Sequence, residues 1–153
     1  MRVAFDLLGT LTPQDDAFPC DRQSPLAGFY LPQGPRLKAG ALLRDLMAAE
    51  HWLTLYSDGP YSEVSIRRWC TYNQLPFHEY VVVSPNLPAI WPPPPGQDII
   101  IDDSPLNIEL ARYYGALGVL IGPMDDDWTE KVYQAILERG SSQRYLEHLE
   151  PLL

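Results

Sequence analysis

The sequence has 153 residues, of which 46% are hydrophobic and 20% are charged, as expected for a globular protein that can bury a sizeable core. Its 11 Lys and Arg residues are scattered among 20 Asp and Glu residues, and the net charge of −9 argues against a nucleic-acid-binding patch. No apolar run approaches the ~20 residues that span a bilayer, and the first residues lack a signal-peptide pattern, so we expect no membrane association and a cytoplasmic location.

Short apolar runs alternate with helical patterns along the chain. The apolar runs predict five buried strands, at 3–7, 52–56, 79–84, 98–101 and 117–121. The helical patterns predict helices at 35–50, 60–75, 105–114 and 128–139. Two segments contain too many breakers for regular structure, a flap-like excursion at 12–34 and a proline-rich connector at 85–97.

This alternation predicts βαβ units with right-handed crossovers. The fold class is therefore α/β, a three-layer Rossmann-like sandwich around a central parallel sheet, formed by residues 1–153 as a single domain. The stretch WPPPP at 91–95 has two interpretations, a stiff connector between strands or a polyproline ligand for a partner's aromatic groove.

Particular residues mark the expected helix ends. Pro35 and Pro60 suit the first turn of a helix, where the missing N–H has no intrahelical partner. Gly115 and Gly140 are expected to end the third and fourth helices. The sequence DWTE at 127–130 matches a capping box at the start of the fourth helix.

Polar side chains follow three of the predicted strands. Asp6 follows the first, Ser57 and Asp58 the second, and Asp102 and Asp103 the fourth. In an open α/β sheet the ligand site lies at the carboxyl ends of the strands, and buried carboxylates there require a positive partner. Their oxygen atoms suit Mg²⁺, which proteins hold with one or two carboxylates and a substrate phosphate.

Three segments in order, FDLLGTLT, LTLYSD and IIIDDSPLNIELARYYGALGVLI, resemble motifs I, II and IV of the haloacid dehalogenase-like superfamily. The third segment is the most specific, because the acidic pair, Ser-Pro, Asn and the glycine-terminated helix all match. The resemblance runs from Arg2 to about Arg139, and the short segments between the motifs leave no room for a cap domain. It implies a core of this fold of the capless type.

The resemblance also implies roles for individual residues. Asp6 would be the nucleophile that forms an aspartyl-phosphate. Asp6 and Asp103, with Asp102 in support and with the backbone carbonyl of Leu8, would bind Mg²⁺, and Asn107 would orient the acidic pair. The phosphate-binding residues would be Ser57, Asp58, Gly9 and Thr10.

Two features depart from the superfamily pattern. Leu8 stands where a second aspartate usually protonates the leaving group, a contribution worth ~10²–10⁴-fold in rate. The motif III lysine has no match between motifs II and IV, and the substitutes considered are Lys38, Arg67 and Arg68. Asp15 and Asp16, on the excursion, are candidates for the missing acid or residues of a solvated turn.

Two functions are compatible with this pattern. The first is a Mg²⁺-dependent phosphohydrolase that acts on a phosphorylated substrate through Asp6, with weak turnover. The alternative is a catalytically impaired binding or interaction module that retains a Mg²⁺ and anion site. Open sites of capless members often take large phosphoesters or gain a lid by oligomerising, so a homo-oligomer is a further expectation.

Overall fold

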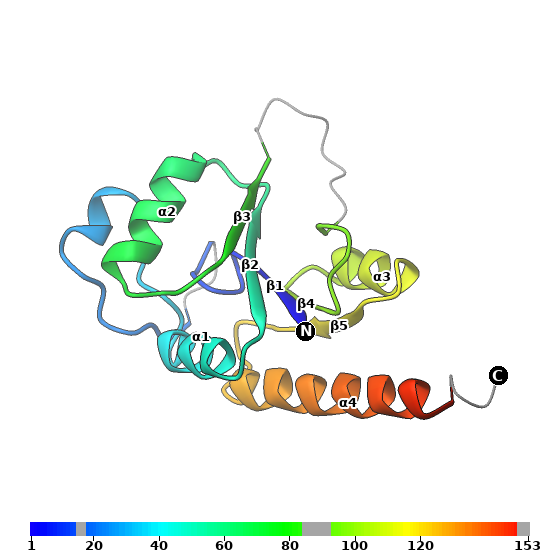
Figure 1. Ribbon diagram of the computed structural model, residues 1–153. Coiled ribbons are helices and arrows are strands. Elements are labelled where there is room, and N and C mark those ends of the chain that lie inside the picture. Colours follow the sequence, from blue (N-terminus) through cyan, green and yellow to red (C-terminus); the bar gives the residue numbers. More distant parts are fainter. Residues whose placement is uncertain (15–17, 84–92, 150–153) are drawn as a thin grey trace.

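The computed structural model describes residues 1–14, 18–83 and 93–149, with side chains described as far as residue 142. The five strands are β1 (Arg2–Asp6), β2 (Trp52–Ser57), β3 (Glu79–Val82), β4 (Ile99–Asp102) and β5 (Leu117–Leu120). The helices are α1 (Ala39–Ala48), α2 (Glu63–Tyr72), α3 (Pro105–Tyr113) and α4 (Trp128–Leu149), with a 3-10 turn, η1, at Ala27–Phe29 (Figure 1).

All five strands are parallel and lie in the order β3-β2-β1-β4-β5 (Figure 1). The β1 strand is at the centre, where Val3 pairs with Leu53 of β2 and with Ile99 of β4. Because every strand runs in the same direction, the carboxyl ends of β1, β2 and β4 meet at one edge of the sheet. The predicted parallel α/β fold is confirmed.

The two faces of the sheet are covered by different helices. Alternate residues of the central strands, such as Phe5, Leu55 and Ile101, pack with α1, α2 and α4 in the larger core. The other set, including Ala4, Tyr56 and Ile100, packs with α3 in a smaller cluster. Figure 1 shows α1 and α2 on one side of the sheet and α3 on the other. The structure is therefore a three-layer sandwich.

The first two helices begin later than the sequence pattern predicted. Pro35 is not in α1, because Arg36 and Leu37 donate backbone N–H groups to Leu11 and Pro19, and Lys38 has a left-handed φ of 71°. Arg36 is thus bonded to the loop after β1 and Leu37 to the excursion at 12–34. Pro60 also lies outside its helix, since α2 begins after Ser62, whose hydroxyl accepts from the Ser65 N–H.

The predicted end of α3 is confirmed, and the predicted end of α4 is wrong. Gly115 follows α3 with a φ of +85°, as expected for a residue that ends a helix. Gly140 does not end α4, which continues to Leu149, because Gly140 keeps a negative φ. A glycine inside a helix costs only about 1 kcal/mol relative to alanine, which is too little to terminate it. None of the helices in the described ranges is both long enough and apolar enough to cross a bilayer.

Candidate active site

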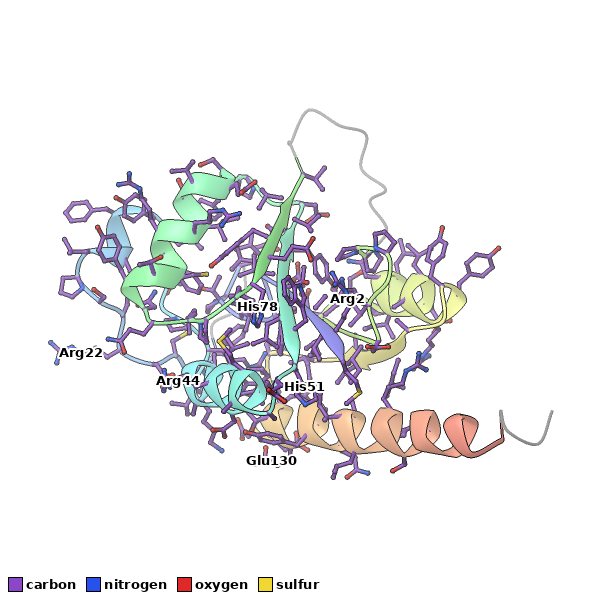
Figure 2. All side chains as sticks on the ribbon, in the orientation of Figure 1. Arg2, Arg22, Arg44, His51, His78 and Glu130 are labelled. Atoms are coloured by element: carbon purple, nitrogen blue, oxygen red, sulfur yellow. The ribbon has the colours of Figure 1, made fainter. Side chains whose placement is uncertain are left out.

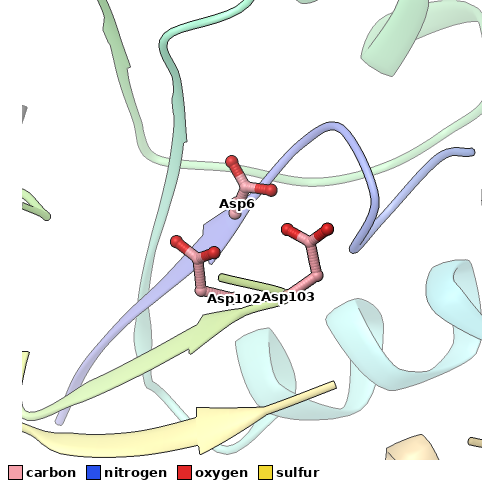
Figure 3. Close-up of side chains that lie close together, drawn as sticks. All are labelled: Asp6, Asp102 and Asp103. Carbon is pink, nitrogen blue, oxygen red and sulfur yellow. The ribbon is translucent and has the colours of Figure 1, made fainter. Parts of the chain in front are cut away.

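Three carboxylates meet at the carboxyl edge of the sheet. Asp6 is the last residue of β1, Asp102 is the last residue of β4, and Asp103 follows it. One oxygen atom from each lies within 4.8 Å of the other two, and Figure 3 shows the three side chains around a common point. Asp6 and Asp102 are buried, with 7% and 1% of their surface exposed, whereas Asp103 is exposed. The sequence-predicted acidic residues are therefore brought together.

Burial and mutual repulsion disfavour the charged forms of these groups. Desolvation raises the pKa of Asp6 well above its ordinary value, and the charges of Asp102 and Asp103 raise it further. Desolvation also raises the pKa of Asp102, in spite of the hydrogen bonds that it accepts. The pKa of Asp103 is raised to about 6 by desolvation and by the neighbouring Asp102. A positive charge bound next to these carboxylates would favour their charged forms.

Tyr56 is a member of the site that sequence reasoning missed. Its hydroxyl donates to Oδ2 of Asp102, and only 3% of its surface is exposed. The same oxygen accepts from Nδ2 of Asn107 at 2.8 Å, and Oδ1 accepts from the Ser104 N–H at 2.8 Å. Asp102 is thus held by three donors, one of which is the predicted Asn107.

The loop after β1 brings Gly9 against the acidic cluster. Gly9 has a φ of +88°, and a Cβ placed on it would overlap the Oδ2 atom of Asp103. The loop is closed by backbone bonds from Leu11 and Thr12 to the Leu7 carbonyl, at 2.9 and 3.0 Å. Only glycine combines this conformation with so close an approach.

The loop after β1 also contains one backbone donor that is engaged and one side-chain hydroxyl that is not. The Gly9 N–H donates to the Thr12 carbonyl at 2.7 Å, so in this structure it is engaged within the loop. Thr10 is fully buried, and its Oγ1 has no hydrogen-bond partner among the described residues. A buried hydroxyl without a partner costs about 1–3 kcal/mol, so Thr10 is a polar group that a ligand could satisfy.

The end of β2 contributes a serine and the loop that follows it. Ser57 is 2% exposed, and its Oγ accepts from the Gly59 N–H at 3.2 Å. Asp58 is exposed and close enough to raise the pKa values of all three clustered aspartates. The half-buried Leu8 side chain lies beside this loop, since a Cβ on Gly59 would be 2.6 Å from Cδ1 of Leu8. Leu8 therefore occupies the space between the loops after β1 and β2.

None of the three proposed substitutes for the motif III lysine is bonded to the acidic cluster. Arg67 pairs with Glu63 at 2.7 Å, and its guanidinium lies over the ring of Tyr80. Arg68 donates to the hydroxyl of Tyr30 at 3.0 Å. Lys38 lies 4.0 Å from a carboxylate oxygen of Glu130.

Arg36, which no sequence pattern indicated, is a buried cation in contact with the loop after β1. It is 3% exposed and donates to the carbonyl of Gly122 at 2.6 Å and to those of Asp125 and Thr10 at 3.3 and 3.5 Å. Its guanidinium also lies over the Phe18 ring, 4.2 Å from the centroid. Asp103 lies within electrostatic range of it. Arg36 thus ties the Thr10 loop to the loop before α4.

The remaining candidates lie elsewhere. Asp15 and Asp16 fall outside the described residues. His51 and His78, labelled in Figure 2, precede β2 and β3 and so lie at the opposite edge of the sheet from the carboxylates. The first part of the proline-rich connector, to residue 92, also lies outside the described residues.

Comparison with solved structures identifies the fold. The HAD domain of the effector protein Lem4 from Legionella pneumophila, an inactive mutant, aligns over 95% of this chain and 97% of that domain, with a TM-score of 0.56 and 15% identity. The parallel sheet and its helices match that domain, and this chain therefore has a haloacid dehalogenase-like fold. The prediction from the three motifs is confirmed at the level of the fold.

Two further structures are similar to this chain. Both contain the Pnkp1/Rnl/Hen1 complex, one of them described as an RNA repair complex, with 13% and 12% identity and TM-scores of 0.56 and 0.58. Each alignment covers 78% of this chain but only 41% and 45% of the other, so this chain spans less than half the length of those proteins. No family model matches the sequence, and no curated protein aligns with it significantly.

Proposed function

We propose that this protein is a Mg²⁺-dependent phosphohydrolase that cleaves phosphomonoesters through an aspartyl-phosphate on Asp6. The observation that carries the proposal is the meeting of Asp6, Asp102 and Asp103 within 4.8 Å, with two of them buried. Like charges at this distance are costly unless a cation binds between them. The fold supports the same conclusion, because it is shared with a HAD domain.

The donor set fits Mg²⁺. The three side chains offer carboxylate oxygens alone, the ligands that this hard cation prefers, and no Cys or His belongs to the cluster. Asp6 and Asp103 would hold the ion together with the Leu8 carbonyl, with Asp102 in support. A bound Mg²⁺ would supply the positive charge that neutralises the carboxylates and the phosphate oxygens.

The hydroxyl-bearing residues would hold the phosphate. Ser57 lies at the end of β2, next to the central strand that ends in Asp6. Thr10 adds a buried hydroxyl without a partner in the described structure. The phosphate would thus lie between the loops after β1 and β2, where Gly9 and Asp58 also belong.

The reaction would proceed in two displacements. An oxygen of Asp6 attacks phosphorus, and the bond to the ester oxygen breaks, so the alcohol leaves and takes a proton from water. Water then attacks the phosphorus of the aspartyl-phosphate, which releases inorganic phosphate and regenerates the Asp6 carboxylate. Leu8 supplies no proton to either step, so both are expected to be slow.

A second candidate function is an interaction module that keeps the metal and anion site without turnover. It is favoured by the aliphatic side chain of Leu8, which fills the space beside Gly59 where a carboxyl group could otherwise act. The similar chains from the Pnkp1/Rnl/Hen1 complex belong to a multi-protein assembly, so a protein partner or a second copy of this chain forms part of this candidate.

Hydrolysis of p-nitrophenyl phosphate separates the two candidates. The phosphohydrolase requires activity in Mg²⁺ that is lost in EDTA and falls to background in Asp6→Asn. Asp21→Asn, a change on the excursion that leaves the acidic cluster intact, is the matched control and should keep full activity. Activity that survives in Asp6→Asn would remove Asp6 as the nucleophile, and binding of Mg²⁺ without any hydrolysis would favour the interaction module.

A further inference from the structure

We infer that Tyr56 is a positioning residue of the Mg²⁺ site, which fixes the Asp102 carboxylate so that Asp6 and Asp103 are left to hold the ion. This inference rests on the metal site of the proposed function but does not require hydrolysis. Tyr56 precedes Ser57 in an apolar strand, and its hydroxyl is bonded directly to the acidic cluster.

The first step concerns the position of the phenol. Tyr56 lies on β2 and Asp102 on β4, and these strands are separated by β1. Tyr56 pairs in register with Asp6, so its side chain reaches Asp102 from the far side of the strand that carries the nucleophile. Two strand spacings amount to about 10 Å, which a shorter hydroxyl side chain could not bridge.

The second step concerns the lone pairs of Asp102. A carboxylate oxygen accepts about two hydrogen bonds. Oδ2 of Asp102 receives two, from the Tyr56 hydroxyl and from Nδ2 of Asn107, and Oδ1 receives one from the Ser104 N–H. Oδ2 is therefore fully used, and the orientation of the carboxylate is fixed from two sides. Asp102 is left with at most one free position on Oδ1.

The third step concerns charge. Tyr56 and Asn107 are neutral donors, so they orient Asp102 without cancelling its negative charge. A Lys or Arg in the same place would also orient the carboxylate, but it would repel a divalent cation bound a few ångströms away. The phenol thus preserves the attraction of the cluster for Mg²⁺. Residues that orient metal ligands in this way typically change metal affinity 10–100-fold when they are replaced.

The test is an isothermal titration with MgCl₂ of the full chain at pH 7.5. Tyr56→Phe removes the hydroxyl and keeps the ring, and we expect it to weaken Mg²⁺ binding at least about tenfold while the circular dichroism spectrum is unchanged. Tyr133→Phe is the matched control, because it removes a Tyr–Asp hydrogen bond of 2.8 Å, to Asp45, between α4 and α1. It should bind Mg²⁺ as the wild type does.

A second variant tests the same oxygen from the other side. Asn107→Leu removes the other donor to Oδ2 of Asp102, and the inference requires that it too weaken Mg²⁺ binding. Wild-type affinity in folded Tyr56→Phe would overturn the inference. So would a Tyr56→Phe protein that fails to fold, because the hydroxyl would then serve the fold rather than the metal site.

The outcomes for the inference and for the proposed function are separable. A wild type that binds Mg²⁺ but does not hydrolyse p-nitrophenyl phosphate, with weakened binding in Tyr56→Phe, would remove the phosphohydrolase and support the inference. Normal Mg²⁺-dependent hydrolysis by the wild type, with unchanged Mg²⁺ affinity in Tyr56→Phe, would support the phosphohydrolase and overturn the inference about Tyr56. A wild type that binds no Mg²⁺ would overturn the inference.

Discussion

The hydroxyl of Tyr56 donates to the Asp102 carboxylate across the central strand of the sheet, so that β2, β1 and β4 all contribute to one acidic site. Asp102 is buried and accepts two further hydrogen bonds, whereas Asp103 is exposed and Asp6 is at the tip of β1. Asp102 is therefore the member of the cluster whose orientation is fixed by donors from three different residues. Substitutions at the individual residues of the site are therefore expected to differ in their effects on Mg²⁺ binding, stability and activity.

Leu8→Asp should raise the rate of phosphomonoester hydrolysis. The Leu8 side chain lies beside Gly59, near Ser57, so an aspartate in its place would put a proton donor and acceptor at the proposed phosphate site. General acid–base catalysis typically contributes ~10²–10⁴-fold, and we expect an increase in kcat of at least about tenfold. Leu8→Asn is the matched control, because asparagine has the shape of aspartate but cannot exchange a proton. Equal rates in the two variants would show that the missing acid does not limit turnover.

Gly9→Ala should abolish Mg²⁺ binding and destabilise the protein. The new Cβ would overlap the carboxylate of Asp103, and the φ of +88° is unfavourable for any residue with a side chain. Gly115→Ala is the control, since Gly115 has a φ of +85° but nothing within 4 Å of the position of a Cβ. Both variants should lose about 1 kcal/mol to backbone strain, measured by urea denaturation. Only Gly9→Ala should lose the calorimetric signal of Mg²⁺ binding, and retained binding would place the metal elsewhere.

Asp103→Asn should stabilise the metal-free protein at neutral pH. The pKa of Asp103 is about 6 in the folded state and near 3.8 in the unfolded state, so between these values the folded state binds more protons. The free energy of unfolding of the wild type should therefore fall as the pH rises through this window and stay low above it. Since Asp103 is exposed and screened, we expect a gain of about 1 kcal/mol in Asp103→Asn at pH 7.5, or about 2–4 °C in Tm.

The same comparison has an internal control. The difference between Asp103→Asn and the wild type should shrink toward pH 4, where the wild-type carboxyl is already protonated. Mg²⁺ should raise the Tm of the wild type and have little effect on Asp103→Asn, because a ligand stabilises only the state that binds it. A variant that is less stable than the wild type at pH 7.5 without metal would contradict the account of the acidic cluster.

Arg36→Met should destabilise the protein and weaken Mg²⁺ binding. The change would remove the hydrogen bonds from the guanidinium to three backbone carbonyls, those of Thr10, Gly122 and Asp125. We expect a loss of about 2–3 kcal/mol in the free energy of unfolding. Arg44→Met is the control, since its weaker bond to the Gln74 carbonyl, at 3.5 Å, is exposed, and it should stay within about 0.5 kcal/mol of the wild type. Equal effects would show that Arg36 does not support the Thr10 loop.

The strands and the acidic cluster could be predicted because each depends on residues that are close in sequence. A buried parallel strand is a short apolar run, and a polar residue directly after it lies at the carboxyl edge of the sheet. Asp6, Asp102 and Asp103 follow from this rule alone. The same rule predicted the position of Ser57, which is the last residue of β2. Asn107 lies in the first turn of α3, where it was expected.

Tyr56 and Arg36 could not be predicted because their partners are distant in sequence. Tyr56 lies 46 positions from Asp102, and in an apolar strand it has the pattern of a core residue. The available signal was the two-residue alternation, which places Tyr56, Asp6 and Asp102 on the same face of the sheet. Arg36 follows Pro35 in a segment that was predicted as helix, and its carbonyl partners lie 26 to 89 positions away.

The central claim, that Asp6 is a nucleophile, is tested most directly by acid-quench intact-mass spectrometry of the protein mixed with p-nitrophenyl phosphate and Mg²⁺. Because Leu8 supplies no base for the second displacement, the aspartyl-phosphate should accumulate, and the account predicts a phosphate adduct that maps to the peptide containing Asp6. The adduct should be absent from Asp6→Asn and from samples in EDTA. Hydrolysis of the substrate with no adduct on Asp6, at the same rate in Asp6→Asn, would contradict the claim.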